Sequence, residues 1–100
     1  ETTGTEYSAG GNTLTGNAVS NVANYATVDF TDSVWGSPTP ATFSAAYGAI
    51  YNSSASNKLV VILDFGGTKS CSNGTFTVTF PSPTSGSPTG ADALLSIKSN

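Results

Sequence analysis

The sequence predicts an all-β domain in which about five to seven strands form an antiparallel β-sandwich of the jelly-roll or immunoglobulin-like kind. Two observations lead to this prediction. Apolar and polar residues alternate along several short segments, which is the period of a half-buried strand. Turn-forming residues separate these segments, and no segment has the period of a helix longer than a turn or two. At 100 residues, we expect one domain that spans residues 1–100.

The individual strands follow from this alternation. In residues 42–51 the aromatic residues Phe43, Tyr47 and Tyr51 share one face, so we expect all three to belong to the core. Ala46 and Gly48 on the other face indicate that something packs closely there. The strands are expected at 25–30, 42–51, 58–65 and 75–80, with a closing strand or a single helical turn in 92–98.

Residues 58–65 form the most apolar of these strands. Leu59, Val61, Leu63 and Phe65 occupy one face, and Val60 and Ile62 occupy the other. Apolar residues on both faces are typical of a central strand or of a contact between subunits. Left uncovered, such a strand is prone to aggregation. The sequence therefore predicts an interface, for which the candidate residues are Leu59, Val60, Val61, Ile62, Ala46, Gly48 and Trp35.

The connecting segments are rich in turn formers. Residues 31–41 are expected to be a loop because Pro38 and Pro40 exclude a central strand, and Trp35 in this loop is expected to cover one end of the core. Gly66-Gly67 is expected to end the strand before it, and Asn73-Gly74 predicts a turn. Residues 81–90 are expected to form a Pro/Ser/Gly-rich loop, and 91–100 a terminal strand or tail.

The composition excludes several classes of function. Ser, Thr, Asn and Gly make up 49 of the 100 residues, and only nine residues are charged, with a net charge of −3. The chain contains no His and no Arg, so it lacks the usual base of a catalytic dyad and has no basic patch for phosphates. No apolar run is long enough to span a membrane. We therefore expect no enzyme activity, no catalytic residue, no cofactor, no nucleic-acid partner and no membrane partner.

A few polar residues deserve separate consideration. Asp29 and Asp32 could supply half of a Ca²⁺ site, but two solvated turn residues explain the pair better, and no metal is expected. Asp64, at the end of the strand 58–65, is expected to be partly buried and to bond nearby hydroxyls or amides, and the alternative is that it faces a pocket or a neighbouring subunit. Cys71 stands in a polar stretch without an activating His, so we expect an unreactive thiol. Because the chain begins at Glu1, we expect a processed product or a fragment.

Four blocks of sequence resemble those of one family, small virion proteins of tailed bacteriophages. The blocks are Gly4–Leu14 (similar to G-T-x-Y-x-A-G-G-x-T-L), Phe43–Asn52 (A-R-Y-A-V-I-Y), Leu63–Gly67 (I-D-F-G) and Ser72–Val78 (S-N-G-T-F-T-I). They occur in the same order and cover most of residues 4–80. This chain departs from the pattern at Ala46, where the family usually has Arg, and it lacks the additional N-terminal strand of that family.

The resemblance implies a structural component of a virion without separating head from tail. Together with the strand that is apolar on both faces, it leads us to expect a capsid decoration or cement protein on the capsid surface. Its partners are expected to be further copies of itself, as a homotrimer, and the major capsid protein. The alternative is a glycan-binding or adhesive module of a tail fibre or another extracellular filament, which predicts exposed aromatic side chains.

Overall fold

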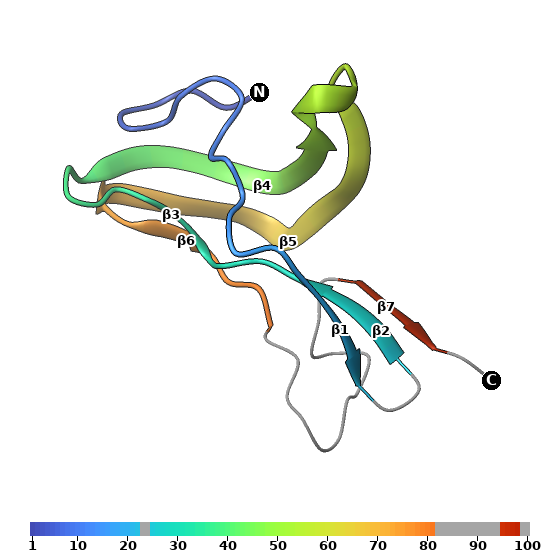
Figure 1. Ribbon diagram of the computed structural model, residues 1–100. Coiled ribbons are helices and arrows are strands. Elements are labelled where there is room, and N and C mark those ends of the chain that lie inside the picture. The colour runs from blue at the N-terminus through green and yellow to red at the C-terminus, as the bar shows by residue number, and fades with distance from the viewer. Residues whose placement is uncertain (23–24, 82–94, 99–100) are drawn as a thin grey trace. The chain divides into compact units, whose positions relative to one another are not determined.

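The computed structural model describes residues 1–22, 25–81 and 95–98 (Figure 1). Strands dominate this part of the chain, and its one helical segment is the short 3-10 helix η1 (Ser53–Ala55). The strands form three small sheets in the orders β1-β2-β7, β3-β6 and β4-β5. The all-β prediction is therefore confirmed. The strands are β1 (Ala18–Val22), β2 (Tyr25–Asp29), β3 (Ser33–Trp35), β4 (Ala41–Asn52), β5 (Lys58–Gly74), β6 (Phe76–Val78) and β7 (Leu95–Lys98).

The chain divides into two compact units, which we call unit 1 and unit 2. Unit 1 comprises residues 1–11 and 35–76, and unit 2 comprises residues 12–34 and 77–100. Each unit is built from segments that are distant in the sequence. The single-domain organisation expected from the sequence stays a prediction. Within the described ranges, no helix has the length and apolar character needed to cross a membrane.

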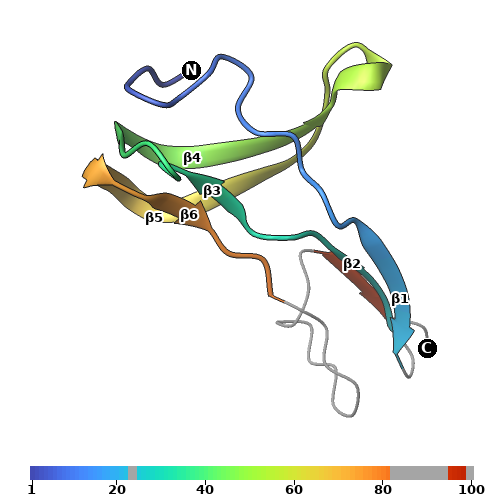
Figure 2. The ribbon, with the colours of Figure 1, turned by 60° about the vertical axis from the view of Figure 1, so that its left-hand side comes forward.

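The hairpin of β4 and β5 is the main element of unit 1 (Figure 2). The two strands run antiparallel, and η1 lies at the turn between them. The side chain of Asn52 accepts a hydrogen bond from the backbone N–H of Ser54, which holds the first residues of this turn. Residues Ser56 and Asn57 complete the turn with positive φ angles. The strand expected at 42–51 is thus confirmed.

The strand β5 is longer than the sequence predicts. Gly66-Gly67 does not end it, because the ladder with β4 resumes beyond these glycines and continues to Gly74. Between the pairs Ala45–Lys69 and Tyr47–Asp64, the four residues 65–68 of β5 stand opposite the single residue Ala46. Both glycines have positive φ angles, so the strand accommodates these extra residues as a bulge instead of breaking.

The core of unit 1 is small and aromatic. Ala41, Phe43 and Cys71 are buried, and partly buried aromatic side chains pack against them. The rings of Phe43 and Phe76 have their centroids 4.8 Å apart, and those of Phe43 and Trp35 are 6.0 Å apart. Trp35 thus lies against the core, as predicted. Cys71, which was expected to be an unreactive thiol, is paired with Phe43 across the ladder and is buried.

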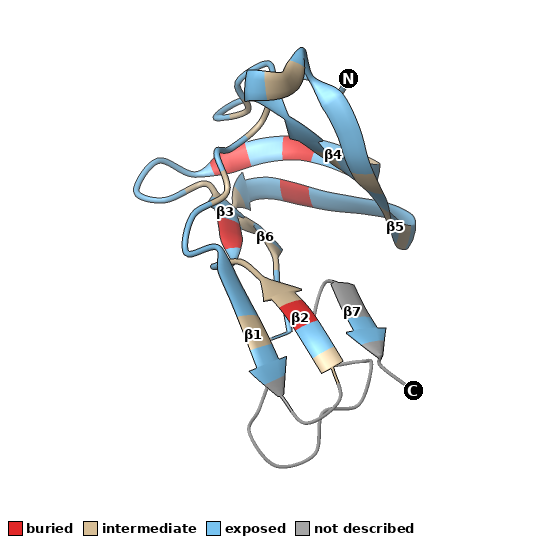
Figure 3. Cartoon of the chain, turned by 45° about the vertical axis from the view of Figure 1, so that its right-hand side comes forward, coloured by how far each residue is buried: buried red, intermediate tan, exposed pale blue. Residues whose placement is uncertain are grey.

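Unit 2 contains the sheet β1-β2-β7, in which β2 is central and both pairings are antiparallel (Figure 3). Thr27, in the middle of β2, is buried, and its hydroxyl donates a hydrogen bond to the carbonyl of Ser20 on β1. The neighbouring Ala26 is exposed. The rings of Phe30 and Phe80 pack edge to face, with their centroids 5.9 Å apart.

Two further segments test the sequence predictions. Residues 31–41 are not wholly a loop, because Ser33–Trp35 form the short strand β3, which ends before Pro38. In residues 75–80 the predicted alternation is confirmed, since Phe76, Val78 and Phe80 are half-buried or buried and the threonines between them are exposed. The expected closing strand is present as β7. Most of the predicted loop at 81–90 lies outside the described residues.

Gly36 packs closely against the backbone of Gly74 and Ala41, and a substitution at Gly36 tests this packing. Gly36 has a φ of +93°, and a Cβ atom there would collide with the carbonyl oxygen of Gly74 and crowd the backbone nitrogen of Ala41. Gly66 also has a positive φ, of +70°, but has open space around it. We expect Gly36→Ala to lower the free energy of unfolding by about 3 kcal/mol and Gly66→Ala by about 1 kcal/mol. Urea titrations of both variants measure this difference, and equal losses would contradict the packing described here.

Candidate functional site

One exposed apolar surface stands out in unit 1, and it lies on the half of the hairpin nearest η1. In the ladder, Ala49 is paired with Ile62 and Tyr47 with Asp64, and directly opposed residues share a face of the sheet. All four residues are exposed. Toward the turn the face continues with Leu59 and Val60. We call these six residues the open hairpin face, and most of this stretch is coloured as exposed in Figure 3.

The opposite face of the same hairpin is covered by the chain itself. Gly48 is paired with Leu63 and Ile50 with Val61, and all four are half-buried. A Cβ atom on Gly48 would come within 3.0 Å of the Phe65 ring, so the absence of a side chain makes room for that ring. The close packing that the sequence predicted on this side is therefore provided by Phe65, within the chain.

The predicted interface residues separate into two groups accordingly. Leu59, Val60 and Ile62 are exposed by 58%, 64% and 61%. Val61, Ala46, Gly48 and Trp35 are half-buried, and at least Gly48 and Trp35 are in contact with the chain's own aromatic rings. The structure thus brings only three of the seven candidates onto one accessible face. Leu59 lies there because the register shifts between Ile50 and Tyr51, which interrupts the alternation along β5.

Two tyrosines on β4 differ from the prediction that they belong to the core. Tyr47 is 65% exposed and Tyr51 is 38% exposed. The hydroxyl of Tyr51 donates a hydrogen bond to the carbonyl of Gly10 at 2.8 Å. The sequence placed both residues with Phe43 because it could not reveal the bulge opposite Ala46, which interrupts the ladder between them and Phe43. Tyr47 and Ala49 are therefore additional members of the exposed surface that the sequence analysis missed.

The charges on this half of the hairpin are few and lie at its two ends. Lys58 stands at the turn end of β5 and Asp64 six residues further along, and both are exposed. No charged residue lies between them, and β4 carries none at all. One oxygen of Asp64 accepts a hydrogen bond from the backbone N–H of Gly66 at 2.8 Å. Asp64 thus bonds a nearby backbone amide at the start of the bulge, as expected, but it is exposed, so the prediction of partial burial is wrong.

The N-terminal segment of unit 1 covers another part of the hairpin. Thr5 and Thr42 exchange two backbone hydrogen bonds, so this segment lies along the free edge of β4. Tyr7 stacks on Trp35 and packs against Phe43. The Glu1 carboxylate accepts hydrogen bonds from the backbone N–H of Gly10 and from the Tyr7 hydroxyl. These contacts fold residues 1–10 into a loop over the aromatic cluster.

Unit 2 contains the two carboxylates that were considered as a half-site for Ca²⁺. One oxygen of Asp32 accepts a hydrogen bond from the backbone N–H of Phe80 at 2.9 Å, so this residue joins two segments that are distant in the sequence instead of capping a local turn. Asp29 is the last residue of β2 and is half-buried, so the prediction of two solvated turn residues is wrong for Asp29. One oxygen of Asp29 is buried without a hydrogen-bond partner. Within the described residues, no three metal-ligating side chains come together.

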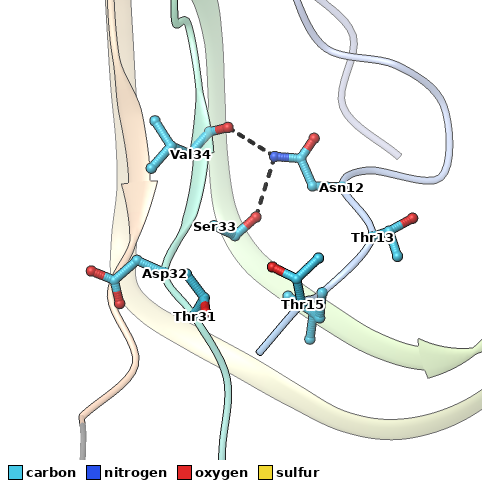
Figure 4. A pocket seen from close by; sticks show the side chains of 8 residues that line it. Asn12, Thr13, Thr15, Thr31, Asp32, Ser33 and Val34 are labelled. Carbon is cyan, nitrogen blue, oxygen red and sulfur yellow. Dashed lines mark hydrogen bonds between the residues drawn. The ribbon is translucent and has the colours of Figure 1, made fainter. Parts of the chain in front are cut away.

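A shallow recess of about 350 Å³ also lies in unit 2 (Figure 4). Residues 12–15 form one side of it and residues 31–34 the other. The amide nitrogen of Asn12 donates hydrogen bonds to the Ser33 hydroxyl and to the Val34 carbonyl, at 3.2 and 2.9 Å, so it joins the two sides. The remaining lining is mostly threonine hydroxyls and contains no aromatic ring. It offers neither a titratable pair nor a stacking surface.

Comparisons with known proteins do not assign the chain to a family. A scan of family models, a search of curated proteins and a search of solved structures each found no match. The open hairpin face therefore rests on its own geometry as the candidate functional site.

The contact between Glu1 and Gly10 predicts a pH dependence in the packing of Tyr7. The hydrogen bond from Gly10, assisted by that from Tyr7, lowers the pKa of Glu1 below its ordinary value of 4.5. Because the pKa of Glu1 is lowered in the folded chain, the hydrogen bonds to its carboxylate are fully present above pH 4.5. They are lost as the pH falls through the pKa that Glu1 has in the folded chain. We expect Trp35 fluorescence to change on acidification below pH 4.5 in the wild-type chain. In Glu1→Gln this carboxylate transition should be absent, and an unchanged transition would contradict the assignment.

Proposed function

We propose that this chain is a structural subunit of a multimeric particle, a bacteriophage capsid decoration or cement protein that stabilises the head through contacts between subunits. In this proposal it lies on the capsid surface as a homotrimer and also contacts the major capsid protein. The observation that carries the proposal is the open hairpin face, where large apolar side chains remain more than half exposed. Exposed apolar patches of this kind mark contacts with other proteins.

Three further observations support a structural role. Few apolar side chains are buried among the residues that the structure describes, so contacts between copies would add substantially to the stability of each chain. The sequence blocks that resemble those of small phage virion proteins include the β4 segment 43–52 and the β5 segment 63–67, which contribute to the same hairpin. The low charge of the chain also limits electrostatic repulsion between closely packed copies.

The β-sandwich belongs to the same proposal. A sandwich requires two sheets packed face to face, about 10 Å apart. The hairpin sheet has one face covered by its own chain and one face open. A second layer on the open face would complete a sandwich, and a neighbouring subunit of the particle can supply it.

The alternative function, glycan binding by a tail fibre or another filament, is favoured by one observation. Tyr47 is exposed, as a sugar-stacking aromatic residue must be. If a host polysaccharide binds there, Tyr47→Ala abolishes the binding. Trp35, by contrast, is packed among other aromatic rings, so its fluorescence should not respond to polysaccharide.

Removing apolar surface from the open hairpin face should weaken self-association. We expect the double variant Val60→Ser with Ile62→Ser to raise the dissociation constant of the chain at least tenfold, because each substitution removes exposed apolar area that association would bury. Sedimentation velocity over a range of concentrations measures this effect. The control is Val19→Ser, since Val19 is 78% exposed but lies on β1 in unit 2. An equal effect of the control would contradict the assignment of the surface.

The location on the particle tests the function itself. Antibodies against the chain should label the heads of the phage particles that carry it, in immunogold electron microscopy. Label confined to tails or fibres would replace the decoration proposal with the adhesive alternative. Particles without any label would contradict both.

A further inference from the structure

We propose that the N-terminal segment of unit 1, residues 1–11, exchanges between copies of this chain, so that the segment of one copy occupies the edge of β4 in a neighbouring copy. We call this segment the strap. The inference rests on the proposed function, because it names a way in which copies are joined within the particle. It can be tested on the purified chain alone.

The strap is held on β4 by specific contacts that bury little of it (Figure 2). Thr5 exchanges two backbone hydrogen bonds with Thr42, and the Thr2 hydroxyl donates a hydrogen bond to the carbonyl of Ser44 at 2.7 Å. Among the first ten residues only Thr2 and Tyr7 are half-buried, and the other eight are exposed. A segment with so little buried surface opens at a lower free-energy cost than the whole domain unfolds.

An open strap leaves behind a site that favours refilling. The backbone N–H and carbonyl of Thr42 lose their partners at the edge of β4. The rings of Phe43 and Trp35 lose the Tyr7 ring that packs against both of them. An unpaired strand edge beside uncovered aromatic rings is suited to accept an added strand.

The shape of this site identifies a second copy as the occupant. A Cβ atom on Gly4 would collide with the carbonyl oxygen of Thr42 and with Phe43, so the incoming segment needs glycine just before the residue that pairs with Thr42. It also needs an aromatic ring two positions after that residue, where Tyr7 lies. The strap of another copy meets both requirements with identical contacts. Copies held side by side in a particle meet at a high effective concentration, which favours the exchanged form.

The connection after the strap allows it to swing outward. Gly10 and Gly11 have φ angles of +92° and +71°, and glycine reaches other backbone conformations without a steric penalty. The next residue, Asn12, is held in unit 2 by hydrogen bonds to Ser33 and Val34. Rotation at the two glycines therefore releases the strap while Asn12 keeps its contacts. Ten extended residues span up to about 35 Å, which is enough to reach an adjacent copy.

Disulfide trapping between chains tests the exchange. Because Thr5 and Thr42 form a hydrogen-bonded pair, cysteines at these positions are close enough for a disulfide. A Thr5→Cys chain is mixed with an equal amount of an isotopically labelled Thr42→Cys chain, and the mixture is concentrated and mildly oxidised. We expect on the order of ten times more disulfide-linked heterodimer, by intact mass spectrometry, than with Ser53→Cys in place of Thr42→Cys. Ser53 is also exposed but lies in η1.

A substitution at Gly4 in the same experiment separates a specific fit from random collision. Adding Gly4→Ala to the Thr5→Cys chain should reduce the yield of heterodimer on the order of tenfold, because the new Cβ atom collides with β4. The matched control is Thr3→Ala, which shortens an exposed side chain of the strap and should leave the yield unchanged. Equal yields from the two variants would contradict the argument that identifies the occupant.

The outcomes separate this inference from the proposed function. A single chain that carries both Thr5→Cys and Thr42→Cys shows whether the pairing of the strap with β4 is intact, since it can form the disulfide internally in dilute solution. If it does so while the mixture yields no more heterodimer than its control, the strap stays on its own chain and the exchange is overturned. If it forms no disulfide within or between chains, the strap does not pair with β4, which overturns the exchange as well. In either case the labelling of heads decides the function independently.

Discussion

The antiparallel register of β4 on β5 is the constraint on which the rest of unit 1 depends. Because side chains alternate along a strand, this register determines which residues face the aromatic cluster and which face outward. With Gly48 opposite Leu63 and Ile50 opposite Val61, the covered side receives small and aliphatic residues that leave room for Phe65. The same register necessarily turns Ile62 outward. The exposed surface and the covered one therefore have a single cause.

The aromatic cluster then explains why so few buried residues suffice. Phe43 contacts the rings of Tyr7, Trp35 and Phe76, and its backbone lies opposite that of Cys71. Rings packed at these distances contribute beyond the area they bury. They cannot cover both faces of a long two-stranded sheet, however. A hairpin that is stabilised on one face only leaves the other face available to a partner.

Much of the fold could be predicted from the sequence because its strands alternate clearly. The segment at 42–51 and the alternation at 75–80 agree with the structure. The errors arise where backbone geometry or tertiary contacts override local patterns. Gly66-Gly67 is a turn signal in isolation, but here the positive φ angles form a bulge within a continuing strand. The burial of Cys71 opposite Phe43 is a further feature that its polar sequence neighbours do not indicate, and no prediction was made for it.

The sequence predicts only part of the open hairpin face, because backbone geometry again overrides the local pattern. The apolar run at 58–65 identified Leu59, Val60 and Ile62 as interface candidates, and these residues are exposed. Tyr47 was missed because assigning it to a face requires the register, which depends on the bulge opposite Ala46. A single-sequence pattern can indicate that a strand is apolar on both faces. It cannot indicate which of the two faces the chain will cover for itself.

The bulge at residues 65–68 also has a consequence for how the hairpin can vary during evolution. It divides the ladder into two halves, each with its own register, and a Cβ atom added at Gly66 or Gly67 would have no neighbouring atom within 4 Å. Residues inserted or deleted there would leave both halves aligned, whereas a single insertion on either side would turn Ile62 or Cys71 to the wrong face. Variation in chain length should therefore accumulate at this one position, which makes it a suitable point for introducing a peptide tag.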